Sequence, residues 1–160
     1  MSMSKFNSWK GDTLQGKINH ATDTLRVMLT NTAPNAADNV VDTTTSTCTL
    51  KATSNAAEIA AGSGYAKKGP AIGSLSLSGS SGTWKLTAAA VTVTASGGTI
   101  GPFQYAVFYS DTGGTTSTRP VIGHIDLAAA VTLQDGDSIT FGKDNTGAAW
   151  DSTTPLVTDS

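Results

Sequence analysis

Residues 103–110 read Phe-Gln-Tyr-Ala-Val-Phe-Tyr-Ser, and this stretch decides the fold. Its alternate positions form an apolar series: Phe103, Tyr105, Val107 and Tyr109. The intervening residues include Ala106 and Phe108, so the opposite face of the strand is apolar as well. A strand that is apolar on both faces is normally central in a sheet with both faces covered. We therefore expect residues 103–110 to be an inner strand of a layered β-structure.

Other short stretches repeat the period of two that is typical of strands. The clearest are residues 24–31, 84–93, 120–127 and 138–142. They are separated by Gly, Ser and Asp turns, and about seven or eight such strands are typical of an antiparallel β-sandwich or jelly roll. The fold prediction is thus all-β, with a short N-terminal arm or helix (1–20), a sandwich domain (21–150) and a polar tail (151–160).

The expected core follows from the inward face of each strand. It comprises Leu25, Val27, Leu29, Val91, Val93, Tyr105, Val107, Ile122, Ile139 and Phe141. Residues 35–58 contain few large apolar side chains, and we expect an exposed loop with one edge strand near 48–51. Gly123 interrupts its strand and predicts a bulge or a close approach of backbone.

Composition excludes several classes of function. Charged residues make up only 14% of the chain, against roughly 25% in ordinary soluble domains. A net charge of -2 gives no electrostatic footprint for nucleic acid or an acidic membrane. No apolar run has the roughly 18 residues of a membrane span, and the N-terminus has no signal-peptide pattern. Cys48 is the only cysteine, which excludes an internal disulfide and cysteine-based metal sites.

Three local patterns bear on chemistry, and each is weak. Residues 11–17 match the start of a phosphate-binding loop, but Ile18 stands where Ser or Thr would hold magnesium. His124 and Asp126 share one strand face, yet no nucleophile elbow accompanies them. Asp135-Gly136-Asp137 reads as a β-turn without the further acidic positions of a calcium loop. We therefore predict no catalytic, cofactor-binding or metal-binding residues and no enzymatic activity.

The N-terminal arm holds large apolar side chains in an otherwise polar segment: Phe6, Trp9, Leu14 and Ile18. Gly11 and Gly16 make it a poor independent helix, and the arm precedes the first strand. We expect these residues, together with Trp150 near the other end, to contact a partner rather than the sandwich itself.

The ordered set of sequence blocks resembles a class of tailed-bacteriophage virion proteins. The blocks are residues 5–9 (KFNSW), 23–34 (DTLRVMLTNTAP), 60–65 (AAGSGY), 97–109 (GGTIGPFQYAVFY), 120–123 (PVIG) and 135–137 (DGD). They span most of residues 5–142. The Thr-rich segment from Asp42 to Ala57 departs from the pattern.

This resemblance implies a capsid decoration (cement) protein, or a related head or tail appendage, with a β-sandwich or jelly-roll fold. The implied partner is the major capsid protein. We also expect a homo-oligomer, a trimer before a dimer, because closed cyclic symmetry buries apolar patches that a monomer of 160 residues would expose. The implied location is the outer surface of the virion, after synthesis in the bacterial cytoplasm, where a chain without disulfides suits the reducing conditions. The alternative is a head- or tail-fibre module that binds host surface glycan, and a glycan depolymerase is the least favoured hypothesis.

Overall fold

The structure, a computed structural model, describes residues 3–73, 76–80, 83–141 and 157–159. Its elements follow in chain order: β1 (Ser4–Lys5), α1 (Trp9–Leu14), β2 (Leu25–Thr30), β3 (Val40–Asp42), β4 (Thr49–Lys51), β5 (Ala71–Ile72), β6 (Ser76–Ser80), β7 (Thr83–Thr87), β8 (Val91–Thr94), β9 (Ile100–Ser110), β10 (Arg119–Leu133), β11 (Ser138–Phe141) and β12 (Val157–Asp159). No helix in these ranges is long and apolar enough to cross a membrane. The prediction of an all-β, sandwich-like fold with a short N-terminal helix is confirmed.

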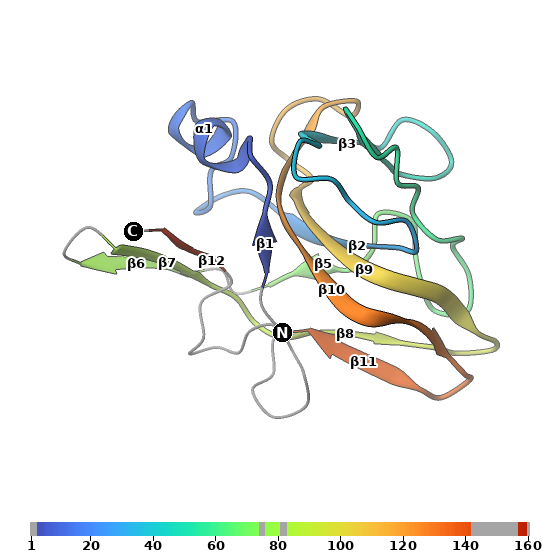
Figure 1. Cartoon of the computed structure of the whole chain (residues 1–160). Helices are drawn as coiled ribbons and strands as arrows, with labels where there is room; N and C mark the ends of the chain where they lie inside the picture. The colour runs from blue at the N-terminus through green and yellow to red at the C-terminus, as the bar shows by residue number, and fades with distance from the viewer. Residues whose placement is uncertain (1–2, 74–75, 81–82, 142–156, 160) are drawn as a thin grey trace.

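A strongly curled antiparallel sheet dominates the fold (Figure 1). Its strand order is β4-β3-β10-β9-β2-β5, and β1 pairs with β10. Strands β8 and β11 form a separate pair, and β12-β7-β6 a third sheet. The long strands β9 and β10 lie at the centre of the large sheet, as expected for residues 103–110.

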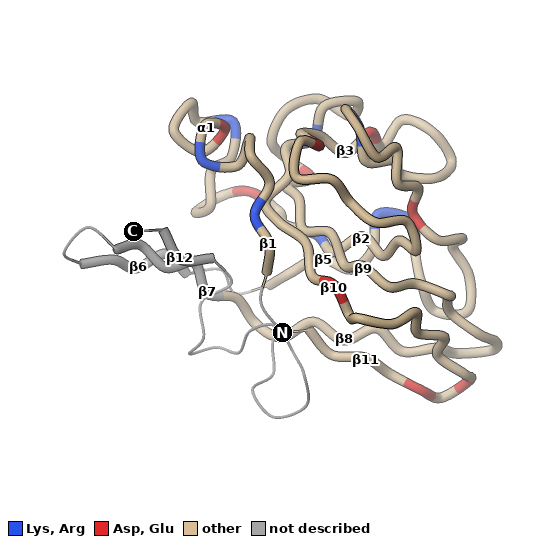
Figure 2. The backbone as a smooth tube through the Cα atoms, viewed as in Figure 1, with Lys and Arg blue, Asp and Glu red and all other residues tan. Residues whose placement is uncertain are grey.

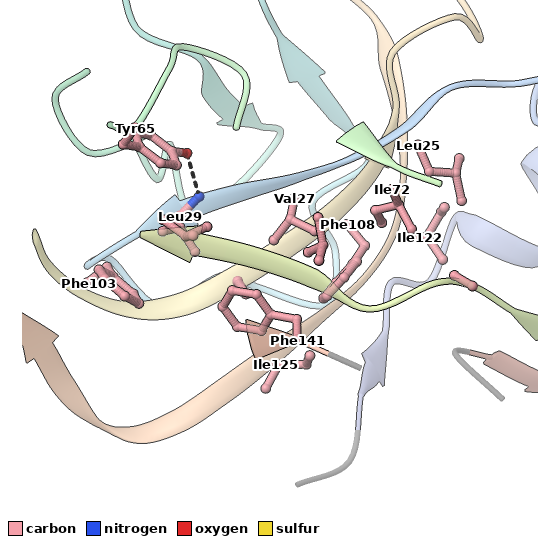
Figure 3. Close-up of a cluster of buried hydrophobic side chains, with 14 of the residues drawn as sticks. Leu25, Val27, Leu29, Tyr65, Ile72, Phe103, Phe108, Ile122, Ile125 and Phe141 are labelled. Carbon is pink, nitrogen blue, oxygen red and sulfur yellow. Dashed lines mark hydrogen bonds between the residues drawn. The ribbon is translucent and has the colours of Figure 1, made fainter. Parts of the chain in front are cut away.

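One face of the large sheet packs against the β8–β11 pair. Figure 3 shows the resulting core, to which β2, β9, β10 and β11 each contribute side chains. Its largest members are fully or almost fully buried: Leu25, Val27, Leu29, Phe103, Phe108, Ile122, Ile125 and Phe141. Val91 and Val93 of β8 close this core from the opposite layer.

The other face of the large sheet carries a second core, part of which comes from residues 35–58. The edge strand expected near 48–51 is present as β4, but the expectation that the remainder is an exposed loop is wrong. Val41, Cys48, Leu50 and Ala56 are all 0% exposed and pack there with Met28, Val107 and Tyr109. Residues 35–58 are therefore not an exposed loop. They form strands β3 and β4, which curl over the sheet and cover the second apolar face of β9.

Two expected core residues, Tyr105 and Ile139, are only half-buried, and a break in register explains Tyr105. On β9, Phe103 and Tyr105 are two residues apart, but their partners on β10 are Val131 and Asp126. The irregularity shifts the alternation, so that Phe103 joins the same core as Ala106 and Phe108. The prediction that Phe103 shares a face with Val107 is therefore wrong.

The outer edge of β2 is closed by loops rather than by a full strand. Val27 donates its amide to the Pro70 carbonyl (3.1 Å), and the Ile59 amide donates to the Leu29 carbonyl (2.9 Å). The Leu29 amide donates to the Tyr65 hydroxyl (3.0 Å; Figure 3), which in turn donates to Glu58 Oε1 (2.8 Å). One buried side chain thus supplies a backbone hydrogen bond that a neighbouring strand would otherwise make.

We expect Tyr65→Phe to lower the free energy of unfolding by about 2–4 kcal/mol, because it leaves the buried Leu29 amide and one oxygen of the buried Glu58 carboxylate without their hydrogen-bond partner. The matched control is Tyr109→Phe, which removes one hydrogen bond to the Lys68 carbonyl (3.1 Å). Its expected cost is about 0.5–1.5 kcal/mol. Urea denaturation measures both, and equal losses would contradict the role given to Tyr65.

Candidate functional site

The N-terminal arm, defined here as residues 3–20, lies across the large sheet. Ser4 and Lys5 pair with His124 and Gly123 on the edge of β10. A Cβ atom on Gly123 would lie 2.7 Å from the Ser4 carbonyl oxygen, so the glycine permits this approach. The close approach of backbone predicted at Gly123 is confirmed, and so is a break in register beside it.

The arm is buried against its own chain. Phe6 is 2% exposed and belongs to the second core, whereas Trp9 (7%) and Ile18 (2%) belong to the first. Side chains this deeply buried offer little area to another molecule. The expectation that Phe6, Trp9 and Ile18 pack on a partner rather than on the sandwich is therefore wrong, and the arm is part of the domain.

Leu14 behaves differently from the other three. It ends helix α1 and is 81% exposed, the one large apolar side chain so exposed among those that the structure describes. Leu14 thus stays a candidate contact for a partner. Trp150 lies outside the described residues.

A cleft of about 590 Å³ lies beside α1. Ser8, Asp12 and Lys17 line it on the arm side. Lining residues on the opposite side include Asn39, Val40, Thr118 and Pro120. Asp12 and Lys17 pair with each other (2.8 Å), so the two charges in the wall of the cleft compensate one another.

Residues 11–17, which match the start of a phosphate-binding loop in sequence, do not form one. Gly11 and Asp12 lie within helix α1, and Lys17 is held by Asp12 rather than placed over a loop. The helix has only six residues. The match in sequence is therefore not accompanied by the strand-loop-helix geometry that the motif requires.

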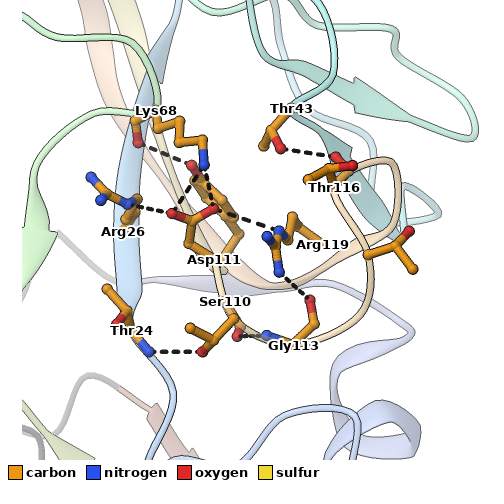
Figure 4. Close-up of polar contacts among 12 residues, drawn as sticks. Thr24, Arg26, Thr43, Lys68, Ser110, Asp111, Gly113, Thr116 and Arg119 are labelled. Carbon is orange, nitrogen blue, oxygen red and sulfur yellow. Dashed lines mark hydrogen bonds and ion pairs between the residues drawn. The ribbon is translucent and has the colours of Figure 1, made fainter.

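Asp111 is the centre of an ion cluster at the start of the loop between β9 and β10 (Figure 4). Its carboxylate contacts Arg26 Nε (2.8 Å), Lys68 Nζ (3.1 Å) and Arg119 Nε (3.5 Å), and only 11% of its side chain is exposed. Three segments distant in sequence meet here. Another nitrogen of Arg119, Nη1, donates to the Gly113 carbonyl (3.3 Å). This hydrogen bond fixes the loop between β9 and β10.

The lone cysteine lies in a buried polar group rather than in a reactive site. Cys48 is 0% exposed, and its amide donates to Glu58 Oε2 (3.2 Å). Burial and the neighbouring Glu58 carboxylate raise the pKa of the Cys48 thiol to about 12. A thiol in this state is a poor nucleophile near neutral pH.

His124 and Asp126 do not form a catalytic pair with a described nucleophile. The His124 ring lies against Phe6 and Tyr105, with ring centroids 5.3 and 6.4 Å apart. Asp126 accepts hydrogen bonds from Gln104 Nε2 (2.9 Å) and from the Ala128 amide (2.8 Å). These contacts are those of a packed ring and of a surface carboxylate that fixes a turn.

The Asp135-Gly136-Asp137 segment is the turn that the sequence predicted. Asp135 accepts from the Gly97 amide (2.8 Å), and Asp137 accepts from the Gln134 amide (2.9 Å). The two carboxylates thus cap backbone. Within the described ranges, no group of three or more His, Cys, Asp or Glu side chains is placed to hold a metal ion.

Comparisons with known proteins identify no relative: no family model, no curated protein and no solved structure matches this chain.

We expect Phe6→Ala to lower the free energy of unfolding by about 3–5 kcal/mol, the usual cost of emptying an aromatic site in a core. Leu14→Ala, on the same arm, is the matched control and should change it by less than about 0.5 kcal/mol. Thermal or urea denaturation measures both. A Phe6→Ala protein as stable as the parent would contradict the assignment of the arm to the core of the domain.

We expect Asp111→Asn to lower the free energy of unfolding by about 2–3 kcal/mol, because three partly buried cations lose their counter-ion. The matched control, Asp126→Asn, keeps the acceptor oxygen of an exposed residue and should cost less than about 0.5 kcal/mol. Denaturation in low salt provides the measurement. An equal, small effect at both positions would show that the cluster contributes nothing to stability.

Proposed function

We propose that this chain is a structural protein of a tailed-bacteriophage virion, a decoration protein that binds the outer surface of the mature head and stabilises it. The proposal joins the ordered resemblance over residues 5–142 to one geometrical observation. Leu14 stands exposed on the arm while the chain buries its other large apolar side chains wherever the structure describes them, apart from a few that are half-buried. Burying such a side chain on a partner contributes roughly 1.5–3 kcal/mol.

The mechanism is mass action. A protein that binds the assembled shell but not its separated subunits stabilises the shell by the free energy of binding. The low charge of the chain suits a molecule present in many copies, because only 14% of its residues are charged and charged positions are sparse along the described backbone (Figure 2). Neighbouring copies then repel one another weakly. We propose a homo-oligomer, a trimer before a dimer, with the major capsid protein as the other partner.

A second candidate function is recognition of a host surface glycan by a head- or tail-fibre module. The observation in its favour is the cleft beside α1. Its wall presents a hydroxyl group of Thr118, an amide of Asn39 and the charges of the Asp12–Lys17 pair, next to the apolar Val40 and Pro120. Such a mixture can bind sugar hydroxyls and the apolar face of a sugar ring.

Co-sedimentation with mature heads assembled without this protein tests the first proposal. We expect saturable binding, and we expect Leu14→Ser to weaken it about tenfold or more, since roughly 1.5 kcal/mol of apolar burial is lost. Gln15→Ser, at the neighbouring exposed position, is the matched control and should bind as the parent does.

Absence of binding to heads would contradict the decoration role. Binding to host lipopolysaccharide or capsule instead, reduced by Thr118→Val in the cleft, would support the fibre module. Sedimentation of the free protein as a 16.2 kDa species at micromolar concentration would contradict the oligomer.

A further inference from the structure

The junction between the arm and the rest of the domain gathers buried polar atoms that lack partners. Among the described residues, five buried side-chain nitrogen or oxygen atoms make no hydrogen bond. Four of them lie at this junction: Ser8 Oγ, Trp9 Nε1, His20 Nδ1 and His124 Nδ1. Because unpaired buried polar groups are unfavourable, they weaken the attachment of the arm while the rest of the fold is well satisfied.

Both histidines of the chain lie at this junction, each against an aromatic anchor of the arm. The His124 ring packs on Phe6 (centroids 5.3 Å apart), and the His20 ring packs on Trp9 (6.3 Å). His20 is 7% exposed and His124 is half-buried. The two side chains that fix the arm therefore both rest on imidazoles.

The hydrogen bonds around His20 indicate the tautomer of its neutral ring. The Thr13 hydroxyl donates to the Trp9 carbonyl (3.0 Å), so its contact with His20 Nε2 (3.4 Å) requires the histidine nitrogen to donate. Nδ1 is then the bare nitrogen, and it has no donor or acceptor beside it. A second proton would create a buried N–H without an acceptor. Protonated His124 would meet the same problem at its own Nδ1.

Charged groups around the two rings act in both directions. Asp23 faces His20, while Asp126 and Asp38 face His124, and all three carboxylates favour the protonated rings. Lys5 Nζ already lies 5.3 Å from the centre of the Trp9 ring, and Asp12 is engaged by Lys17. Burial outweighs the carboxylates, so the pKa of each histidine in the docked arm lies below its ordinary value of about 6.5.

We propose that the arm is a pH-sensitive latch, which docks on β10 while His20 and His124 are neutral and releases when both are protonated, uncovering the edge of β10 at Gly123 and His124. Residues 3–20 form a basic segment, because they contain Lys5, Lys10 and Lys17 but only one acid, Asp12 (Figure 2). Protonation of His20 raises its positive charge further. The latch does not depend on the proposed function.

The sign of the effect follows from proton linkage. When the arm is released, His20 and His124 have the ordinary pKa of histidine and bind protons below about pH 6.5. When the arm is docked, the two rings bind protons only at lower pH. Docking is therefore fully stable above about pH 6.5 and weakens as the pH falls toward the docked pKa values. With two such groups, the docking equilibrium falls by up to about a hundredfold per pH unit in that window.

The experiment uses the full chain with Trp84→Phe and Trp150→Phe, so that Trp9 is the single tryptophan and can be excited selectively. Between pH 7.5 and 5.0 we expect its emission to shift to the red and its quenching by acrylamide to rise, while the far-UV circular dichroism of the β-structure is retained. Gly123→Ala in the same background should give the released signal already at pH 7.5, because its Cβ collides with Met3 and Ser4.

The variant His20→Gln/His124→Gln carries no titrating ring and should lose the pH response. A response that persists in it, or a parent protein whose Trp9 stays buried down to pH 5.0, would overturn the latch. Loss of circular dichroism with the same midpoint would overturn it too, since the whole domain would then be unfolding. Exchange of the Phe6 and Asn7 amides, which bind the Ile122 and Ala36 carbonyls, gives an independent readout in the unmodified chain. Protection unchanged from pH 7.5 to 5.0 would likewise contradict release.

Discussion

The two apolar faces of β9 impose the constraint on which the rest of the fold depends. A strand with Phe103 and Phe108 on one side and Val107 and Tyr109 on the other is stable only when both sides are covered. The β8–β11 pair covers the first side. The second side is covered by β3, β4 and the arm, which together bring Val41, Leu50 and Phe6 onto it. The curl of the large sheet follows, because its own outer strands must fold back over its centre.

Sequence patterns predicted the strands well and the covering of the second face poorly. The alternation in β2, β8 and β11 is a local property, and it identifies a strand whatever packs against it. In residues 35–58 the buried side chains are sparse and irregular, and a small residue such as Ala56 or Cys48 gives little signal. Their burial depends on the shape of a distant sheet. The arm was misjudged for the same reason, although Gly123 did indicate that backbone approaches there.

Among the candidate sites, the sequence predicted the turn formed by consecutive residues, but it did not predict the sites that are formed by residues from distant segments. It identified the Asp135–Asp137 turn, whose hydrogen bonds lie within a few residues or reach the adjacent hairpin. It gave no sign of the Asp111 cluster, because Arg26, Lys68 and Arg119 come from three separate segments and carry no shared motif. The cleft beside α1 is hidden in the same way, since its walls meet only after the arm crosses β10.

The polar interactions divide the molecule into a firmly held side and a weakly held one. On the β2 edge, Glu58, Tyr65 and Asp111 each satisfy several buried or half-buried groups, so that loops serve where a strand is missing. At the arm, four of the buried polar atoms that the structure describes make no hydrogen bond. The arm is held mainly by the buried apolar side chains of Phe6, Trp9 and Ile18. Release of the arm would leave the β9–β10 pairing intact, but it would also withdraw Phe6 from the second core and Trp9 and Ile18 from the first. The exposed Leu14 lies on that same weakly held element. The candidate partner contact and the proposed latch therefore lie on one element, the arm.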